Sequence, residues 1–246
     1  VLDLDLFWRA VQPLDRDYSI FVHLTDGDQL LQAQQDSFPG AGNAPTLGWP
    51  TDVVIPDVHR INIPATAPSP SRLKVDVGVY DHATGERLLV GGYDHWTLGY
   101  VTLLPPEGES GLPHAMNINF GDQIALRGFE FGTRTMAPGD SLPVTLWWEA
   151  LTQLDINYTV FVHLVLPPES TWAQRDDTPL DGSAPTSTWV VGELMEDYYE
   201  LKLPDDAPPG VYFVEVGIFE RATNDRLKVN FSEKGVVLGQ VRVEEK

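Results

Sequence analysis

Apolar and polar residues alternate along several stretches of the chain. These stretches are 2–9 and 142–149, 59–63 and 199–203, and 73–80 and 212–219. A period of two with a polar opposite face is typical of a β-strand buried on one side. The stretch 18–24 carries apolar side chains on both faces, His23 being the exception, which predicts a central strand. With 20 prolines and 21 glycines between these runs, and no long run of helical period, the sequence predicts an all-β fold.

The chain also repeats itself. When it is shifted by 140 residues, 24 of the 67 residues between positions 2 and 68 are identical to those of the second copy. Phe21-Val22-His23-Leu24 then aligns with 161–164, and Ala44-Pro45-Thr46 with 184–186. Because each copy must bury its own core, the repeat predicts two tandem antiparallel β-sandwiches of immunoglobulin or fibronectin type III type. We expect domain 1 over 1–104, a linker over 105–115 and domain 2 over 116–246.

The two copies begin differently. Leu2 aligns with Leu142, so residues 118–141 have no counterpart in copy 1, although they include a predicted strand over 123–131. Domain 1 is therefore expected to be an incomplete sandwich that lacks its N-terminal strand or strands, which would lie upstream in a parent protein. An open sheet edge of this kind invites strand pairing with another chain.

Charge and composition exclude several function classes. The net charge is −20, with 13 acidic and 6 basic residues in 1–104 and 23 acidic and 10 basic residues in 105–246. Both halves would repel a phosphate backbone, so no nucleic-acid partner is expected. The chain has no cysteine, which excludes disulfides and thiolate metal sites. No apolar stretch is long enough to cross a membrane.

Several short motifs occur in both copies. They are Trp-x-Ala, Tyr-x-x-Phe-Val-His-Leu, Ala-Gln-x-Asp-x-x-Pro and Pro-Thr-x-x-Trp, and Val-Gly-Ile-Phe follows in copy 2. Together they resemble a bacterial sandwich repeat often appended to membrane-bound glycosyltransferases of the lipid-linked-sugar mannosyltransferase type, and to other surface proteins. Copy 2 fits fully, including Phe120-Gly121-Asp122 and Ala137-Pro138-Gly139-Asp140, whereas copy 1 lacks that opening. The resemblance implies an accessory module outside the cytoplasm and carries no catalytic residues.

A histidine and an aspartate recur at equivalent positions in both copies. His23 precedes Asp36, and His163 precedes Asp176, by 13 residues each, across an expected hairpin. Such a pair could serve as base and orienter of a nucleophile, but no serine or cysteine recurs beside it. We expect instead a structural polar pair, in which a mostly buried ring bonds the carboxylate or nearby loop backbone.

Three tryptophans without an identical counterpart are candidates for stacking on sugars. Trp96 aligns with Val236, Trp172 with Gln32, and Trp147 with Phe7. Exposed aromatic side chains can stack on a sugar face, and they can equally pack against a neighbouring domain.

The acidic loops carry no specific metal signature. The acidic loops Asp26-Gly27-Asp28, and Asp176-Asp177 with Asp181, lack the spacing of an EF-hand loop. Apart from Asp176, their acidic positions are not shared between the copies. We therefore expect no metal site, no cofactor and no enzymatic activity. The sequence favours a non-catalytic extracytoplasmic spacer or interaction module of a larger surface protein. The alternatives are a carbohydrate-binding module and a self-assembling structural subunit.

Overall fold

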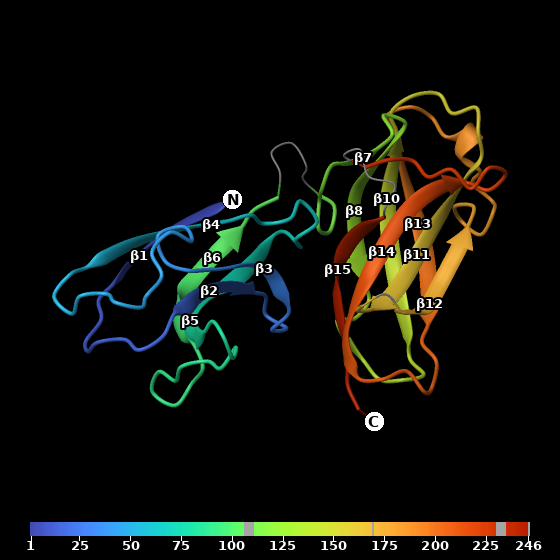
Figure 1. Ribbon diagram of the computed structural model, residues 1–246. Helices are drawn as coiled ribbons and strands as arrows, with labels where there is room; N and C mark the ends of the chain where they lie inside the picture. Colours follow the sequence, from blue (N-terminus) through green and yellow to red (C-terminus); the bar gives the residue numbers. More distant parts are fainter. Residues whose placement is uncertain (106–110, 169, 230–234, 246) are drawn as a thin grey trace. The chain divides into compact units, whose positions relative to one another are not determined.

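The computed structural model describes residues 1–105, 111–168, 170–229 and 235–245. Within them the chain is almost entirely β-structure, with one 3₁₀ turn at Thr186–Thr188, which confirms the predicted fold class. The chain divides into two compact units, Val1–Pro64 with Ser71–Leu103, and Ala65–Pro70 with Leu104–Lys246 (Figure 1). Part of the expected linker, 106–110, lies outside the described residues. No helix among the described residues is long and apolar enough to cross a membrane.

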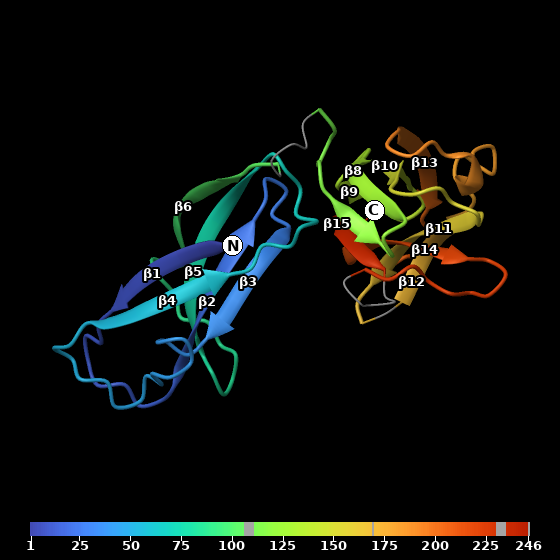
Figure 2. The same ribbon diagram turned by 90° about the horizontal axis from the view of Figure 1, so that it is seen from above.

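Domain 1 is a sandwich of a two-stranded and a four-stranded sheet. The strands are β1 (Leu2–Trp8), β2 (Tyr18–Thr25), β3 (Leu31–Ser37), β4 (Ile55–Ile61), β5 (Ser71–Asp81) and β6 (Trp96–Leu103). One sheet is β1-β4 and the other is β3-β2-β5-β6, all antiparallel. Figure 2 shows β1 and β4 as a separate pair alongside the larger sheet. The predicted central strand is β2, whose Ile20, Val22 and Leu24 point into the core between the sheets.

Domain 2 repeats this arrangement and extends it. Its strands are β7 (Ile118–Phe120), β8 (Ile124–Phe131), β9 (Thr135–Met136), β10 (Ser141–Ala150), β11 (Tyr158–Leu166), β12 (Ser170–Asp177), β13 (Leu194–Lys202), β14 (Gly210–Glu220) and β15 (Val236–Val243). One sheet has the order β13-β10-β8-β7, and the other has the order β12-β11-β14-β15-β9. The inward side chains of both sheets, among them Trp148, Phe129 and Tyr212, form one continuous core.

The two domains differ at one place in the sandwich. The strand pairing shows which strands are equivalent in the two domains. The pair β1-β4 corresponds to β10-β13, and the pair β5-β6 corresponds to β14-β15. Among the residues that the structure describes, domain 1 has no counterpart of β7, β8 or β9. Among the described residues, both sheets of the first domain therefore end where those of domain 2 continue, at β1 and at β6.

Candidate functional site

The recurring histidines lie beside the recurring aspartates. In domain 2, Nε2 of His163 on β11 lies 2.8 Å from Oδ1 of Asp176 on β12. In domain 1, the equivalent atoms of His23 and Asp36 are 3.6 Å apart. The pKa of His23 is lowered because burial disfavours its charged form, and this effect exceeds the opposite effect of the Asp36 charge, which acts to raise the pKa. The rings are largely covered, and the carboxylates are about one third exposed.

These histidines belong to a stacked cluster on the outer face of the larger sheet. The ring of Phe21 lies 4.6 Å from that of His23, and the guanidinium of Arg87 lies 4.3 Å from its centre. The ring lies across Gly78 of the neighbouring strand, where a Cβ would come within 2.1 Å of it. A glycine is thus required at position 78 of β5, because the aromatic ring occupies the place of a side chain.

Domain 2 repeats the cluster. Phe161 lies 4.8 Å from the ring of His163 and 4.7 Å from the guanidinium of Arg226, and a Cβ at Gly217 would come within 2.3 Å of it. An aromatic ring on an outer sheet face is thus buried almost completely in both domains. This packing explains why the same four residue types recur.

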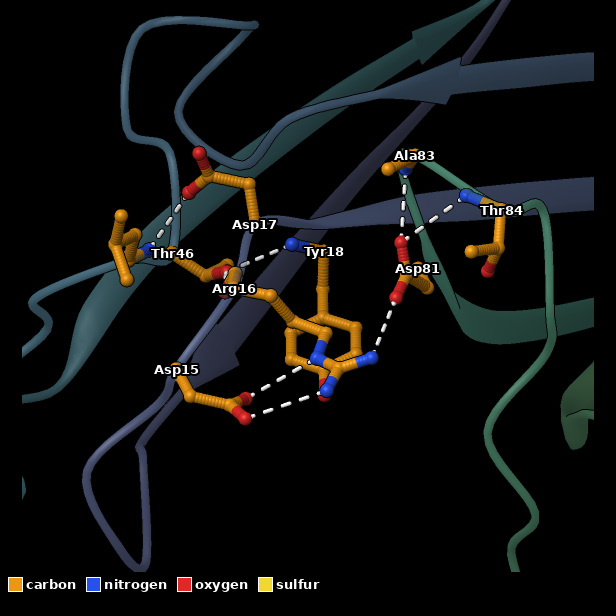
Figure 3. Close-up of polar contacts among 9 residues, drawn as sticks. Asp15, Arg16, Asp17, Tyr18, Thr46, Asp81, Ala83 and Thr84 are labelled. Atoms are coloured by element: carbon orange, nitrogen blue, oxygen red, sulfur yellow. Dashed lines mark hydrogen bonds and ion pairs between the residues drawn. The ribbon is translucent and has the colours of Figure 1, made fainter.

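The recurring Ala-Pro-Thr segment fastens a long loop to the sheet. Oγ1 of Thr46 accepts a hydrogen bond from the backbone N–H of Tyr18 (2.8 Å) and donates to the carbonyl of Arg16 (3.2 Å), as Figure 3 shows. Arg16 also pairs with Asp81 at 2.9 Å. In domain 2, the hydroxyl of Thr186 binds the N–H of Tyr158 and the carbonyl of Ile156 in the same way. The segment therefore has a structural role in both copies.

A buried carboxylate anchors the other end of this loop in domain 1. Asp57 accepts hydrogen bonds from Gly40 N–H (2.8 Å) and from Nε1 of Trp8 (3.0 Å), and Nε2 of His59 lies 2.7 Å away. Burial acts to raise the pKa of Asp57, but the hydrogen bonds from His59, Gly40 and Trp8 and the charge of His59 together outweigh it and hold the pKa below its ordinary value. Sequence reasoning did not single out this aspartate, although its identity in both copies was a usable signal.

The equivalent carboxylate of domain 2 has a neutral partner. Asp197 accepts hydrogen bonds from Leu180 N–H (2.9 Å) and from the hydroxyl of Tyr199 (2.6 Å). Here burial dominates and raises the pKa of Asp197. Burial and the nearby carboxylate also raise the pKa of Tyr199 well above its usual range. The recurring polar residues are therefore used inside each sandwich, to hold loops.

The three candidate tryptophans differ in their exposure. Trp147 lies on the outer face of β10 and is half-buried. Trp172 is the extra residue of a bulge in β12, between the pairs Leu164↔Ala173 and Val165↔Thr171. The bulge breaks the alternation, so Trp172 packs against the core of domain 2 rather than standing exposed as the sequence suggested. Only Trp96 of the three is exposed, at 61%.

Trp96 borders a hollow in domain 1. The hollow encloses about 440 Å³ and is lined by Val90, Gly91, Tyr93, His95, Trp96 and Thr97. Nδ1 of His95 lies 2.7 Å from Oδ1 of Asp94. This hydrogen bond and the one that Arg87 donates to Asp94 lower the pKa of Asp94 to about 2. Two exposed aromatic rings beside ionised and polar groups are a combination that can hold a sugar.

The acidic loops do not converge. Among the described residues, no group of three or more histidines, aspartates or glutamates is placed to hold a metal ion. Asp26 instead binds backbone within its own turn, accepting hydrogen bonds from the N–H groups of Asp28 and Leu30. In domain 2, Asp177 and Asp181 both pair with Arg175.

The most unusual feature of domain 1 is its uncovered strand β1. The inward side chains of β10, from Leu142 to Trp148, are completely buried at 0% exposure. Their counterparts on β1, from Leu2 to Trp8, are only half-buried, although they also face the core. In domain 2, β8 pairs with β10 and adds Leu126 and Phe129 to the core. No described strand occupies that position beside β1.

The opposite sheet is uncovered at the same place. Leu98 on β6 is 46% exposed, whereas its counterpart Leu238 on β15 is 0% exposed. A Cβ at Gly239 would lie 3.1 Å from the ring of Phe131 on β8, but a Cβ at the equivalent Gly99 would meet nothing within 4 Å. Domain 1 thus leaves apolar side chains partly exposed beside the free edges of β1 and β6, and we call this place the open strand position.

Comparisons with known proteins add little to this picture. No protein-family model matches the chain, and no curated protein matches it. A Niemann-Pick type C2 protein from the Japanese carpenter ant is 7% identical, with a TM-score of 0.32 over 48% of this chain and 91% of that chain. The D0-D1 domain of Intimin is 10% identical, with a TM-score of 0.25 over 99% of this chain and 90% of that chain. At these values the two likenesses say nothing of ligand or activity, and the fold rests on the strands themselves.

Proposed function

We propose that the chain is a non-catalytic interaction module of a larger extracytoplasmic surface protein, and that a further β-strand, added beside β1 at the open strand position, completes domain 1. The observation that carries the proposal is the contrast between β1 and β10. The equivalent inward side chains are covered by β8 in domain 2 and only half-buried in domain 1. A strand added to β1 would pair its backbone groups and bury apolar surface, which is how β-strand addition gains affinity.

The rest of the molecule supports a role in interaction. The recurring histidines, aspartates and threonines serve the packing of their own domain, as their hydrogen bonds indicate. The strongly negative charge keeps a surface module soluble and away from nucleic acid. A membrane-anchored glycosyltransferase is a parent of the kind that the motif resemblance implies, with this chain as its spacer or docking part.

A chain that carries its own strand tests the proposal. A second copy of residues 114–140 placed directly before Val1 reproduces the order in which β7, β8 and β9 precede β10. We expect the melting temperature of domain 1 to rise and the amides of β1 to exchange more slowly with deuterium, because the added strand pairs with β1. The matched control carries Leu126→Asp and Phe129→Asp in the added copy only, and it should give no gain. If the melting temperature of domain 1 is the same with and without the added segment, domain 1 does not accept a strand.

Carbohydrate binding is the second candidate, and the hollow beside Trp96 favours it. The exposed rings of Tyr93 and Trp96 border this hollow together with His95. A single aromatic platform on the surface gives weak affinity, so an array of glycans presented at high density is the suitable assay.

Trp147 and Trp172, the two tryptophans of domain 2 that the sequence suggested for stacking on sugars, serve as controls for Trp96. Trp96→Ala should abolish glycan binding without altering the fold, whereas Trp147→Ala and Trp172→Ala should leave binding unchanged, since neither residue lines the hollow. An array without hits, or binding that survives Trp96→Ala, refutes this site.

A further inference from the structure

A second hollow of domain 1 lies on the outer face of its larger sheet. It encloses about 390 Å³, which is within the range of small-ligand pockets. One side of it is the turn between β2 and β3, and the other side consists of side chains from β5 and β6. The lining residues, all in the first compact unit, are Asp26, Gly27, Gln29, Arg72, Lys74 and Tyr100.

This hollow is independent of the strands β7, β8 and β9, which have no described counterpart in domain 1. In domain 2, β7 and β8 belong to the sheet opposite β14, and β9 pairs beside β15 at its edge. None of these strands lies over the outer face of β14, which is the strand equivalent to β5. Equivalent strands in domain 1 would therefore leave Arg72 and Lys74 uncovered.

Arg72 is the unusual residue of the hollow. Domain 1 has 13 acidic and 6 basic residues. Those of its basic side chains that pair with aspartates are Arg16, Arg60, Lys74 and Arg87. Among the residues that the structure describes, Arg72 pairs with no carboxylate, and its guanidinium lies 4.1 Å from the ring centre of the exposed Tyr100. Stacking fixes the plane of the guanidinium without using its N–H donors, which remain for an external anion.

The protein itself holds both sides of the hollow in place. Nζ of Lys74 lies 2.8 Å from Oδ2 of Asp76, a carboxylate that is almost fully buried. On the turn, Oδ1 of Asp26 accepts hydrogen bonds from the N–H groups of Asp28 (3.0 Å) and Leu30 (2.9 Å). A hollow that is formed before the ligand arrives loses less conformational entropy on binding.

The charges around the hollow favour a carboxylate over a phosphate. The planar fork of an arginine matches either group. However, Asp76 already pairs with Lys74, and Asp26 lines the same hollow, so the excess positive charge is at most that of Arg72. A singly charged carboxylate suits this balance, whereas the second negative charge of a phosphate would be repelled by the nearby carboxylates.

The other lining groups suit a ligand that carries hydroxyls. Gln29 provides an amide, Tyr100 a phenolic hydroxyl and Asp26 carboxylate oxygens, and all three groups can hydrogen-bond to hydroxyls. Above Gly27 the space is open, since a Cβ there would meet nothing within 4 Å. A uronic acid residue combines one carboxylate with several ring hydroxyls.

We infer that this hollow binds a uronic acid, as the free sugar or as a residue of an acidic glycan, with its carboxylate on the guanidinium of Arg72. The inference goes beyond the proposed function and does not rest on the open strand position. It concerns a different place from the hollow beside Trp96, because the two share no lining residue.

Domain 2 does not repeat the site. The strand register identifies the residues equivalent to Arg72, Lys74 and Tyr100, which are Val211, Phe213 and Gln240. The turn 26–29 corresponds to a different sequence that begins with Leu166 and Pro167. We therefore expect one site per chain, in domain 1.

Titration of the isotope-labelled full chain with galacturonate, followed by nuclear magnetic resonance, tests the inference. Galactose is the matched control, because it has the same ring without the carboxylate. We expect saturable shifts of the amide signals of 26–29, β5 and β6 with galacturonate, and none with galactose. Oligogalacturonate distinguishes the two sources of the ligand: tighter binding than galacturonate identifies an acidic glycan, and weaker binding identifies the free sugar acid.

Variants then locate the carboxylate. Arg72→Gln should weaken binding about tenfold or more, because it removes a charge-assisted pair, and Arg72→Lys should restore only part of it, because lysine lacks the planar fork. Arg72 is exposed, so an unchanged melting temperature is expected and shows that the fold is intact. Arg9→Gln is the matched control, since Arg9 is also exposed but lines neither hollow. Arg9→Gln and Trp96→Ala should both leave binding unchanged.

The inference is overturned if galacturonate causes no saturable shift or if galactose causes the same shifts. Binding that survives Arg72→Gln, or that falls equally with Arg9→Gln, also contradicts it, because the anion would then be attracted without a defined site. If inorganic phosphate or a glutamate-rich peptide binds more tightly than both uronate probes, the ligand is not an acidic sugar. None of these results bears on the strand beside β1, which the experiment with added residues 114–140 tests separately.

Discussion

Replacing Gly78 by alanine tests the packing that explains the recurring Phe-His-Gly-Arg cluster. The new Cβ would lie 2.1 Å from Cζ of Phe21 and 2.9 Å from the carbonyl oxygen of Asp94, and both distances are shorter than a van der Waals contact. The ring cannot swing away freely, because it is 1% exposed and Arg87 lies 4.3 Å from its other face. Forcing an additional carbon into a packed site costs about 1–3 kcal/mol. For a domain of this size, that lowers the melting temperature by about 4–20 °C.

Differential scanning calorimetry measures this loss, and Gly99→Ala is the matched control. Gly99 also lies in a strand of the same sheet, but a Cβ there meets nothing within 4 Å. This control should be neutral or slightly stabilising, because alanine reduces the entropy of the unfolded chain. If Gly78→Ala melts at the same temperature as Gly99→Ala, the ring of Phe21 does not depend on the glycine and the explanation of the cluster is wrong.

Changes at four further positions test the polar contacts. Thr186→Ala should cost about 1–3 kcal/mol in urea unfolding, because it leaves a buried backbone N–H without a partner, whereas Thr186→Ser should restore most of the stability. The pKa of Asp57 is lowered in the folded state, so its ionisation contributes to the stability of domain 1 above the ordinary carboxyl pKa. This contribution is lost as the pH falls through the lowered pKa. Calorimetry at stepped pH should therefore show that Asp57→Asn reduces the loss of stability of domain 1 in acid. The pKa of Asp197 is raised in the folded state, so its protonated form contributes to the stability of domain 2 below the ordinary carboxyl pKa. This contribution is lost as the pH rises through the raised pKa. Asp197→Asn should therefore reduce the loss of stability of domain 2 that accompanies rising pH. His163→Ala should destabilise domain 2 by about 1 kcal/mol, and more than His23→Ala destabilises domain 1, because only the first breaks a 2.8 Å bond; equal losses would contradict this.

Part of the candidate site could be predicted from the sequence. The missing counterpart of residues 118–141 in copy 1 was visible in the repeat, and it predicted the open edge of β1. The second wall of the open strand position was not visible, because β6 becomes a wall only through its pairing with β5 across the sheet. The meaning of Gly99 likewise required Gly239 and Phe131 to be seen in contact.

The sequence by itself determined the strands, their duplication and the lack of a counterpart of residues 118–141 in copy 1. Each of these follows from local alternation and from comparison of the chain with itself, and neither requires knowledge of contacts. The alternation also placed Trp148 and its neighbours in the core.

Only the tertiary structure decided where individual side chains act. A bulge in β12 turned Trp172 toward the core, and the empty face of Gly78 let Phe21 be buried on an outer sheet face. His59 and Tyr199 occupy equivalent places and each acts to lower the pKa of its neighbouring aspartate, yet the pKa of Asp57 is lowered while burial raises that of Asp197. These outcomes depend on strand register and on contacts between residues far apart in the chain, and a pattern of apolar and polar positions does not contain that information.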